Sequence, residues 1–201
     1  MKIGVFGGTF NPPHNGHLYL AQIWRERLGL DQFLMIPTGT PPHKEPSDVS
    51  GEDRLAMCRL AATAVGDWLE VSDFEVRQGG RSYSVLTLTA LHERYPDSDF
   101  YMVMGADMFM SLETWCRFDE LKKLATFCTM PRDGIGTEQL ERYRLRLASL
   151  GCRGIVADVP EMALSSSAVR ARVKAGLSID GMVPDSVARY IADHGFYREE
   201  D

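Results

Sequence analysis

Residues 2–18 read K-I-G-V-F-G-G-T-F-N-P-P-H-N-G-H-L. The first five residues form a short apolar run that favours a strand, and two glycines follow it directly. Apolar residues within 18–28 recur at the helical period, so we expect a helix that begins near Asn15. The stretch therefore predicts a strand, a glycine-rich loop and a helix, which together form the first unit of a parallel sheet with crossover connections.

The same alternation continues through most of the chain. The sequence predicts six short strands, at 2–6, 32–36, 68–73, 100–104, 125–130 and 154–156. Helical patterns stand between them, at 18–28, 54–65, 84–94 and 137–150, and two more follow at 166–174 and 186–194. Asp185 and Ser186 after Pro184 are expected to cap the last helix. We expect an α/β fold, an open Rossmann-like parallel sheet with helices on both faces and a small C-terminal helical lobe.

Length and composition limit the architecture and the location. With 201 residues, of which 44% are hydrophobic and 25% charged, the chain fits one domain, 1–201, with 165–201 as its C-terminal lobe. No apolar run approaches the roughly 20 residues of a membrane-spanning helix, and the N-terminus does not resemble a signal peptide. The sequence predicts a cytoplasmic protein without a membrane partner.

Charge and cysteine content exclude further classes of protein. A net charge of −6 argues against a nucleic acid partner, because nucleic acid binding depends on a large basic surface. The four cysteines, Cys58, Cys116, Cys128 and Cys152, are widely spaced, so we expect reduced thiols that mostly fill the core.

The first strand-to-helix junction is the best candidate for a binding site. In open α/β sheets, ligands bind beyond the carboxyl ends of the strands, where a helix N-terminus offers N–H groups to a phosphate. Gly7 and Gly8 let the backbone approach a ligand closely. The junction matches neither the dinucleotide fingerprint nor the Walker A motif, so a different phosphate site is expected.

His14 and His17 stand three residues apart at this junction and would face the same side of the helix. Two imidazoles could donate hydrogen bonds to one phosphate chain, with Gly16 leaving room for the ligand. The simpler alternative is that either histidine only caps the helix or satisfies a local hydrogen bond. A zinc site lacks a nearby third ligand, since the closest acidic residue is Glu26, so no protein-bound metal is predicted. Mg²⁺ arriving with a nucleotide needs few protein ligands.

Three further segments carry candidate site residues. In the loop after the second strand, His43 and Lys44 follow two consecutive prolines. Lys44 could bind a polyphosphate, or it could be an ordinary solvent-exposed lysine. Three serines, 165–167, precede a helix that carries Arg170, and they could cap it or bind a second phosphate. After the fourth strand, Asp107 suits a ribose hydroxyl, and Trp115 could stack on a planar ring or pack in the core.

Taken together, these segments resemble the bacterial nicotinate-nucleotide adenylyltransferases, which belong to the nucleotidyltransferase superfamily with the H-x-G-H motif. The matching segments span nearly the whole chain. They are G-G-T-F-N-P-P-H-N-G-H at 7–17, P-P-H-K at 41–44, G-G-R-S-Y-S at 79–84, G-A-D at 105–107, Trp115, Pro131-Arg132, S-S-S-A-V-R at 165–170 and V-P-D-S-V-A-R-Y-I at 183–191.

The resemblance implies transfer of AMP from ATP to nicotinate mononucleotide, with Mg²⁺ accompanying ATP, to give deamido-NAD and pyrophosphate. It implies direct in-line attack without a covalent enzyme intermediate. The implied catalytic residues are His14, His17 and Lys44. The implied ATP-binding residues are Gly7, Gly8, Thr9, Phe10, His14, His17, Gly105, Asp107, Ser166, Ser167 and Arg170. The implied mononucleotide-binding residues are Thr9, His43, Lys44, Ser82, Tyr83, Trp115 and Arg132.

Three positions depart from the family pattern, and several alternatives stay open. Asn11 stands where Asp is common, Leu86 also replaces an Asp, and Cys116 replaces an aromatic residue; the last two concern how the mononucleotide is bound. The alternatives are the same transfer to nicotinamide mononucleotide or phosphopantetheine, a metal hydrolase using His14, His17 and His43, and a nucleotide-sensing module without activity. The sequence does not fix the oligomeric state and is compatible with a homo-oligomer.

Overall fold

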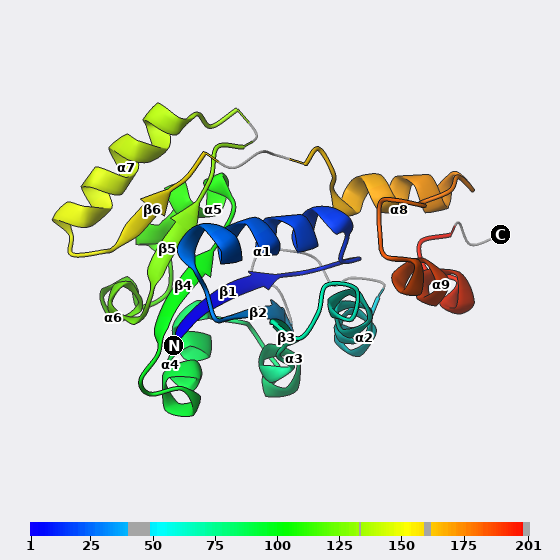
Figure 1. Ribbon diagram of the computed structural model, residues 1–201, viewed down its shortest axis with the longest axis horizontal. Helices are drawn as coiled ribbons and strands as arrows, with labels where there is room; N and C mark the ends of the chain where they lie inside the picture. The colour runs from blue at the N-terminus through cyan, green and yellow to red at the C-terminus, as the bar shows by residue number, and fades with distance from the viewer. Residues whose placement is uncertain (40–48, 133, 159–161, 199–201) are drawn as a thin grey trace.

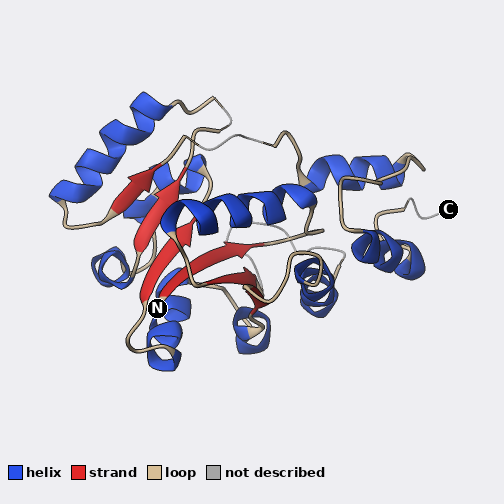
Figure 2. Ribbon diagram, in the orientation of Figure 1, coloured by secondary structure: helices blue, strands red, loops and turns tan. Residues whose placement is uncertain are grey.

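The computed structural model describes residues 1–39, 49–132, 134–158 and 162–198. Within these residues a single six-stranded sheet runs through the molecule, with all of its strand pairs parallel and in the order β3-β2-β1-β4-β5-β6 (Figures 1 and 2). The strands are β1 (Lys2–Gly8), β2 (Gln32–Pro37), β3 (Leu69–Val71), β4 (Asp99–Val103), β5 (Thr126–Thr129) and β6 (Gly154–Val156). The predicted α/β fold with a Rossmann-like parallel sheet is confirmed.

Helices connect the strands and cover both faces of the sheet. They are α1 (Asn15–Leu28), α2 (Gly51–Ala62), α3 (Phe74–Gln78), α4 (Ser84–Arg94), α5 (Ala106–Met110), the 3-10 turn η1 (Leu112–Thr114), α6 (Phe118–Leu124), α7 (Thr137–Ser149), α8 (Ser166–Lys174) and α9 (Asp185–His194). None of the described helices is both long and apolar enough to cross a membrane.

The core consists of two apolar clusters, one on each face of the sheet. Side chains alternate between the two faces along each strand, so each strand contributes to both clusters. Phe33 and Met35 of β2 pack with α1, α2 and α9, whereas Leu34 and Ile36 of the same strand pack with α4 to α7. The first helices therefore lie on one face and the middle helices on the other. Of the four cysteines, Cys116 is exposed and the other three are buried, and no disulfide forms among them, as predicted.

Several predicted boundaries were wrong. The second helix was expected at 54–65 but begins at Gly51, because the Ser50 hydroxyl accepts a hydrogen bond from the N–H of Asp53 and so caps it. The third strand is only Leu69–Val71. The last helix begins at Asp185 with Pro184 at the N-cap, so neither Asp185 nor Ser186 is its cap. Helices α3, α5 and α6 and turn η1 were missed, because segments of three to seven residues show too little periodicity.

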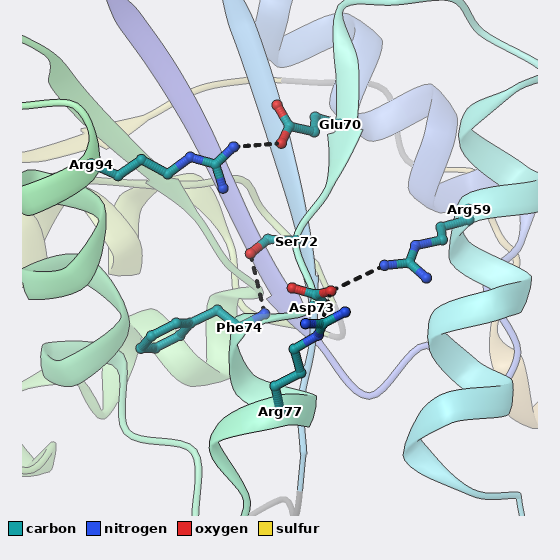
Figure 3. A network of polar contacts seen from close by, with 7 residues as sticks. All are labelled: Arg59, Glu70, Ser72, Asp73, Phe74, Arg77 and Arg94. Atoms are coloured by element: carbon teal, nitrogen blue, oxygen red, sulfur yellow. Dashed lines mark hydrogen bonds and ion pairs between the residues drawn. The ribbon is translucent and has the colours of Figure 1, made fainter.

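The short edge strand β3 is fixed to its surroundings by polar contacts (Figure 3). Asp73, just beyond the strand, accepts from Arg59 of α2 at 3.2 Å and from Arg77 of α3 at 2.7 Å. Glu70 within the strand pairs with Arg94 of α4 at 3.3 Å. These ion pairs are largely exposed and each contributes little energy, but together they join three helices to one sheet edge.

Gly4 in β1 makes room for the core on the α1 side of the sheet. A Cβ at this position would lie 2.4 Å from the Phe33 ring and 2.8 Å from a Leu30 methyl group. At Gly7, three residues later in the same strand, a Cβ would meet no atom within 4 Å. Gly4 is thus required by packing, and Gly7 is not.

We predict that Gly4→Ala lowers the free energy of unfolding by about 2 kcal/mol, because the added methyl group overpacks a closed core. Urea unfolding followed by circular dichroism measures this change. Gly7→Ala is the matched control and should change the free energy of unfolding by less than about 0.5 kcal/mol. Equal effects of the two substitutions would contradict the packing role of Gly4.

Candidate active site

The site forms where the chain connections leave the sheet in opposite directions. Strands β1 and β4 are neighbours, with Val5 opposite Met102. After β1 the chain passes to α1 on one face, and after β4 it passes to α5 on the other. Such a switch in direction opens a crevice at the carboxyl ends of the two strands, which is where open α/β sheets bind ligands.

The loop between β1 and α1, residues 9–14, lies at the carboxyl end of β1, beside this switch point. Gly8 pairs with Pro37 at the end of β2. The Phe10 ring occupies the space that a side chain at this position would need, because a Cβ on Gly8 would lie 2.9 Å from that ring. Phe10 is buried with φ +48°, packed edge-on against Phe6 and His17. The predicted site residues Gly7, Gly8, Thr9 and Phe10 are therefore all at the crevice, with the Phe10 side chain turned into the core.

His14 and His17 stack on one another at the N-terminus of α1, with ring centroids 3.6 Å apart and planes inclined by 21°. The backbone N–H of His14 donates to Nδ1 of His17 at 3.1 Å. Because Nδ1 accepts, the proton of a neutral His17 ring stands on Nε2. No described residue bonds this Nε2, and His17 as a whole residue is half-buried. His17 therefore offers an N–H donor beside the helix N-terminus.

Both imidazoles are neutral at pH 7 in this structure. Burial, together with the nearby charge of Arg132, lowers the pKa of His14 to about 4. Burial also lowers the pKa of His17 well below its usual value, and the neighbouring His14 and Arg132 lower it further. Arg132 follows β5, so the structure brings this predicted residue into the electrostatic field of the histidine pair. Because the imidazoles are neutral, they add no positive charge to the site, whereas Arg132 and the N-terminal end of the α1 dipole do.

Gly16 leaves room for the His14 ring. A Cβ at this position would lie 3.0 Å from Nδ1 of His14, so the missing side chain accommodates the imidazole. Nδ1 of His14 is buried, and within the described part of the chain it has no hydrogen-bond partner. The ring is positioned by stacking and packing.

Helix α8 begins beside the β1–α1 loop, as Figure 1 shows at the N-terminal end of α1. Ser166 Oγ donates to the carbonyl of Pro12, and Arg170 Nη1 donates to the carbonyl of Asn11, both at 2.8 Å. Ser167 Oγ accepts from Arg170 at 3.2 Å, while Ser165 is the N-cap of α8. The predicted residues Ser166 and Arg170 thus lie beside the β1–α1 loop and hold it in place.

A second connection between α1 and the C-terminal segment lies one turn away. The backbone N–H of Asn15 donates to Met182 O at 2.9 Å, and its side-chain amide donates to Gly181 O at 2.8 Å. The α1 N-terminus is therefore held by the turn between α8 and α9 as well as by α8 itself.

Arg54 is a residue of this region that the sequence reasoning missed. It is 2% exposed, and its guanidinium donates to Thr9 O at 2.7 Å, Thr38 O at 2.7 Å and Gly39 O at 2.9 Å. Burial lowers the pKa of Arg54, and the three carbonyls compensate for the loss of water. This side chain joins the loops after β1 and β2. It stands on a helix among ordinary charged residues, so no sequence pattern marks it.

Glu75 was also missed, and it organises the segment that carries Ser82 and Tyr83. Its Oε1 accepts from Thr87 Oγ1 at 2.6 Å, and burial raises its pKa. Ser82 Oγ accepts from the N–H of Gly39 at 3.1 Å, which attaches this segment to the loop after β2. Tyr83 is the N-cap residue of α4 and packs with Trp115 against the second apolar cluster. Trp115 is half-buried, with part of its surface packed against this cluster.

Of the remaining predicted residues, two lie at the start of α5 and two lie outside the described part of the chain. Gly105 is the N-cap of α5, and its lack of a Cβ accommodates Asp107 Oδ1, which would otherwise lie 2.7 Å away. Asp107 is exposed in the first turn of α5, at the β4 side of the crevice. His43 and Lys44 lie outside the described residues. Within the part of the chain that is described, no group of three or more His, Cys, Asp or Glu side chains could hold a metal ion.

Comparison with known proteins assigns the family. Residues 5–172 match the cytidylyltransferase-like family. A probable nicotinate-nucleotide adenylyltransferase of Enterococcus faecalis is 38% identical over 99% of this chain and 86% of its own length. One of Geobacillus thermodenitrificans is 40% identical over 98% of this chain and 86% of its own length.

The chain belongs to the nicotinate-nucleotide adenylyltransferase family.

Solved structures agree with this family at the level of the fold. A Plasmodium falciparum nicotinic acid mononucleotide adenylyltransferase, complexed with NaAD, has a TM-score of 0.78 at 15% identity and covers 98% of this chain and 97% of its own. A Vibrio parahaemolyticus structure described as a nicotinate-nucleotide adenylyltransferase has a TM-score of 0.69 at 20% identity, with coverages of 99% and 96%. At these identities the likeness concerns the fold of the adenylyltransferase family.

The lowered pKa of His14 predicts a dependence of stability on pH. Well above pH 6.5 the His14 ring is neutral in both the folded and the unfolded chain. Between pH 6.5 and about 4 the unfolded chain binds a proton that the folded chain does not, so stability falls as the pH falls. From pH 7 to pH 5 this costs about 2 kcal/mol. Urea unfolding of the wild type and His14→Gln at both pH values measures it.

The variant should lose about 2 kcal/mol less than the wild type over this interval, because it lacks the titrating ring. The same pH dependence in both proteins would show that His14 is not held neutral.

Proposed function

We propose that the protein transfers AMP from ATP to nicotinate mononucleotide, forming deamido-NAD and pyrophosphate. The observation that carries the proposal is the stacked His14–His17 pair, with the Nε2–H donor of His17 beside the N-terminus of α1 in the switch-point crevice. Family membership over nearly the whole chain supplies the acceptor. The Plasmodium falciparum relative of the same fold was solved with NaAD and with APC.

The proposed reaction is a direct displacement. A phosphate oxygen of the mononucleotide attacks the α-phosphorus of ATP in line, a new P–O bond forms, and the bond between the α-phosphorus and the bridging oxygen breaks. Pyrophosphate leaves with that oxygen and its electron pair. The attacking phosphate is already an anion near pH 7, so no protein base is required. Catalysis then depends on positioning and on stabilising the charge that moves to the leaving group.

This chain's residues take the following roles in the proposal. His17 donates from Nε2 to the triphosphate where charge builds up, and His14 supports its ring and faces the same phosphates. Arg132 and Arg170 add positive potential, and Lys44 joins them from the loop after β2. Asp107 contacts a ribose hydroxyl, and Ser82, Tyr83, Trp115 and His43 form the mononucleotide side. Mg²⁺ enters with ATP, held mainly by phosphate oxygens and water.

Pyrophosphate release by the purified protein with ATP and Mg²⁺ tests the proposal. Nicotinate mononucleotide, nicotinamide mononucleotide and phosphopantetheine are compared as acceptors at equal concentration. Release that is fastest with nicotinate mononucleotide supports the proposal, and a preference for another acceptor moves the protein to that substrate. Binding of ATP without release from any acceptor indicates the sensing alternative. Release of phosphate that zinc restores after chelation indicates the hydrolase.

We predict that His17→Ala lowers kcat by about 100-fold or more, because it removes a donor to the transition state. Steady-state pyrophosphate release measures kcat, and circular dichroism confirms that the variant is folded. His194→Ala, which removes an exposed histidine at the end of α9, is the control and should retain wild-type kcat. A folded His17→Ala protein with near-normal kcat would refute the role given to His17.

A further inference from the structure

Asn11, in the middle of the β1–α1 loop, is held at two points by residues from the C-terminal end of the chain. Its main-chain carbonyl accepts from Arg170 Nη1 at 2.8 Å. Its side-chain Oδ1 accepts from the phenol O–H of Tyr197 at 2.5 Å. Tyr197 lies three residues beyond the end of α9, and 186 positions along the chain from Asn11. The contact therefore joins the β1–α1 loop to the last described turn of the chain.

Backbone strain concentrates at this contact. Three residues other than glycine have positive φ among the described residues, and two of them are Phe10 at +48° and Tyr197 at +64°. Phe10 directly precedes Asn11, so the two conformations occur on the two sides of one hydrogen bond. For a residue other than glycine, a positive φ costs about 1–3 kcal/mol. Such a conformation persists where the surrounding structure fixes it. Their coincidence indicates a functional constraint at the contact.

The phenol of Tyr197 is partly buried near the arginines that fix the loop. The charges of Arg170 and Arg54 both act on it, and Arg54 is the side chain that holds the carbonyl of Thr9. Burial raises the pKa of Tyr197, so the phenol keeps its proton and acts as a donor at pH 7. Tyr197 thus reaches the loop at Asn11, the residue that Arg170 also holds, two positions from the Arg54 attachment at Thr9.

Only Pro12 and Pro13 separate Asn11 from His14. Each proline ring fixes φ, so the chain between Asn11 and His14 has fewer free torsions with which to absorb a displacement of Asn11. We propose that Tyr197 is a positioning residue, whose hydrogen bond to Asn11 sets the orientation of the His14–His17 pair toward the triphosphate. The inference rests on the proposed function, because it concerns the geometry of that same reaction.

Tyr197→Phe removes the hydroxyl and retains the ring, and it should lower kcat about tenfold. KM for nicotinate mononucleotide should change by less than about twofold, since no contact with that substrate is altered. Tyr190→Phe is the matched control. It removes a phenol hydroxyl from the same C-terminal region, one that donates to Asp53 on α2 at 3.0 Å and not to the loop. Its kcat should equal that of the wild type.

A double-mutant cycle tests whether the effect passes through Asn11. Asn11→Ala should also lower kcat, and the double variant with Tyr197→Phe should be no slower than Asn11→Ala alone. Multiplied effects in the double variant would show that Tyr197 acts independently of Asn11 and would overturn the proposal.

Long-range ¹H–¹⁵N NMR of the histidine rings gives a readout that does not depend on activity. The signals of His14 and His17 should shift in Tyr197→Phe and stay in place in Tyr190→Phe. If the wild type releases no pyrophosphate with any acceptor, the proposed function fails, and these spectra still decide whether Tyr197 orients the pair. Unchanged ring signals in Tyr197→Phe, or equal kcat in the two Tyr→Phe variants, would overturn the inference.

Discussion

The hydrogen bond from the backbone N–H of His14 to Nδ1 of His17 decides what this site can do chemically. It satisfies the first free N–H at the start of α1 and fixes the tautomer of His17, so that the proton of the neutral ring is on Nε2. A neutral donor at a helix N-terminus suits a phosphate whose charge increases during reaction, because it is already oriented before that charge develops. The pair costs little repulsion, since both rings are uncharged.

Holding that arrangement requires contributions from distant parts of the chain. Arg54 attaches the loop to β2, α8 supplies Ser166 and Arg170, and the chain beyond α9 supplies Tyr197. The sheet places the loop at the crevice, and the C-terminal helices determine its conformation. Helix α8 and the turn after α9 thus contribute to the site through their contacts with the β1–α1 loop.

The sequence predicted the sheet, the first junction and the histidine pair because each depends on local patterns: apolar runs, paired glycines and a spacing of three residues. It did not predict Arg54, Glu75 or the contact of Tyr197 with Asn11, because these depend on side chains that meet only after folding. Gly16 shows the same limit, since a glycine between two histidines does not reveal which neighbour needs its space. Short helices such as α5 were missed for lack of periodicity.

The structure of the protein crystallised with Mg²⁺, a non-hydrolysable ATP analogue and nicotinate mononucleotide tests the central claim most directly. The account predicts a phosphate oxygen about 3 Å from Nε2 of His17, with Nδ1 still accepting from the N–H of His14. It also predicts that the triphosphate lies between the β1–α1 loop and the start of α8. A nucleotide bound elsewhere, or a His17 ring turned so that Nδ1 faces the phosphate, would contradict it.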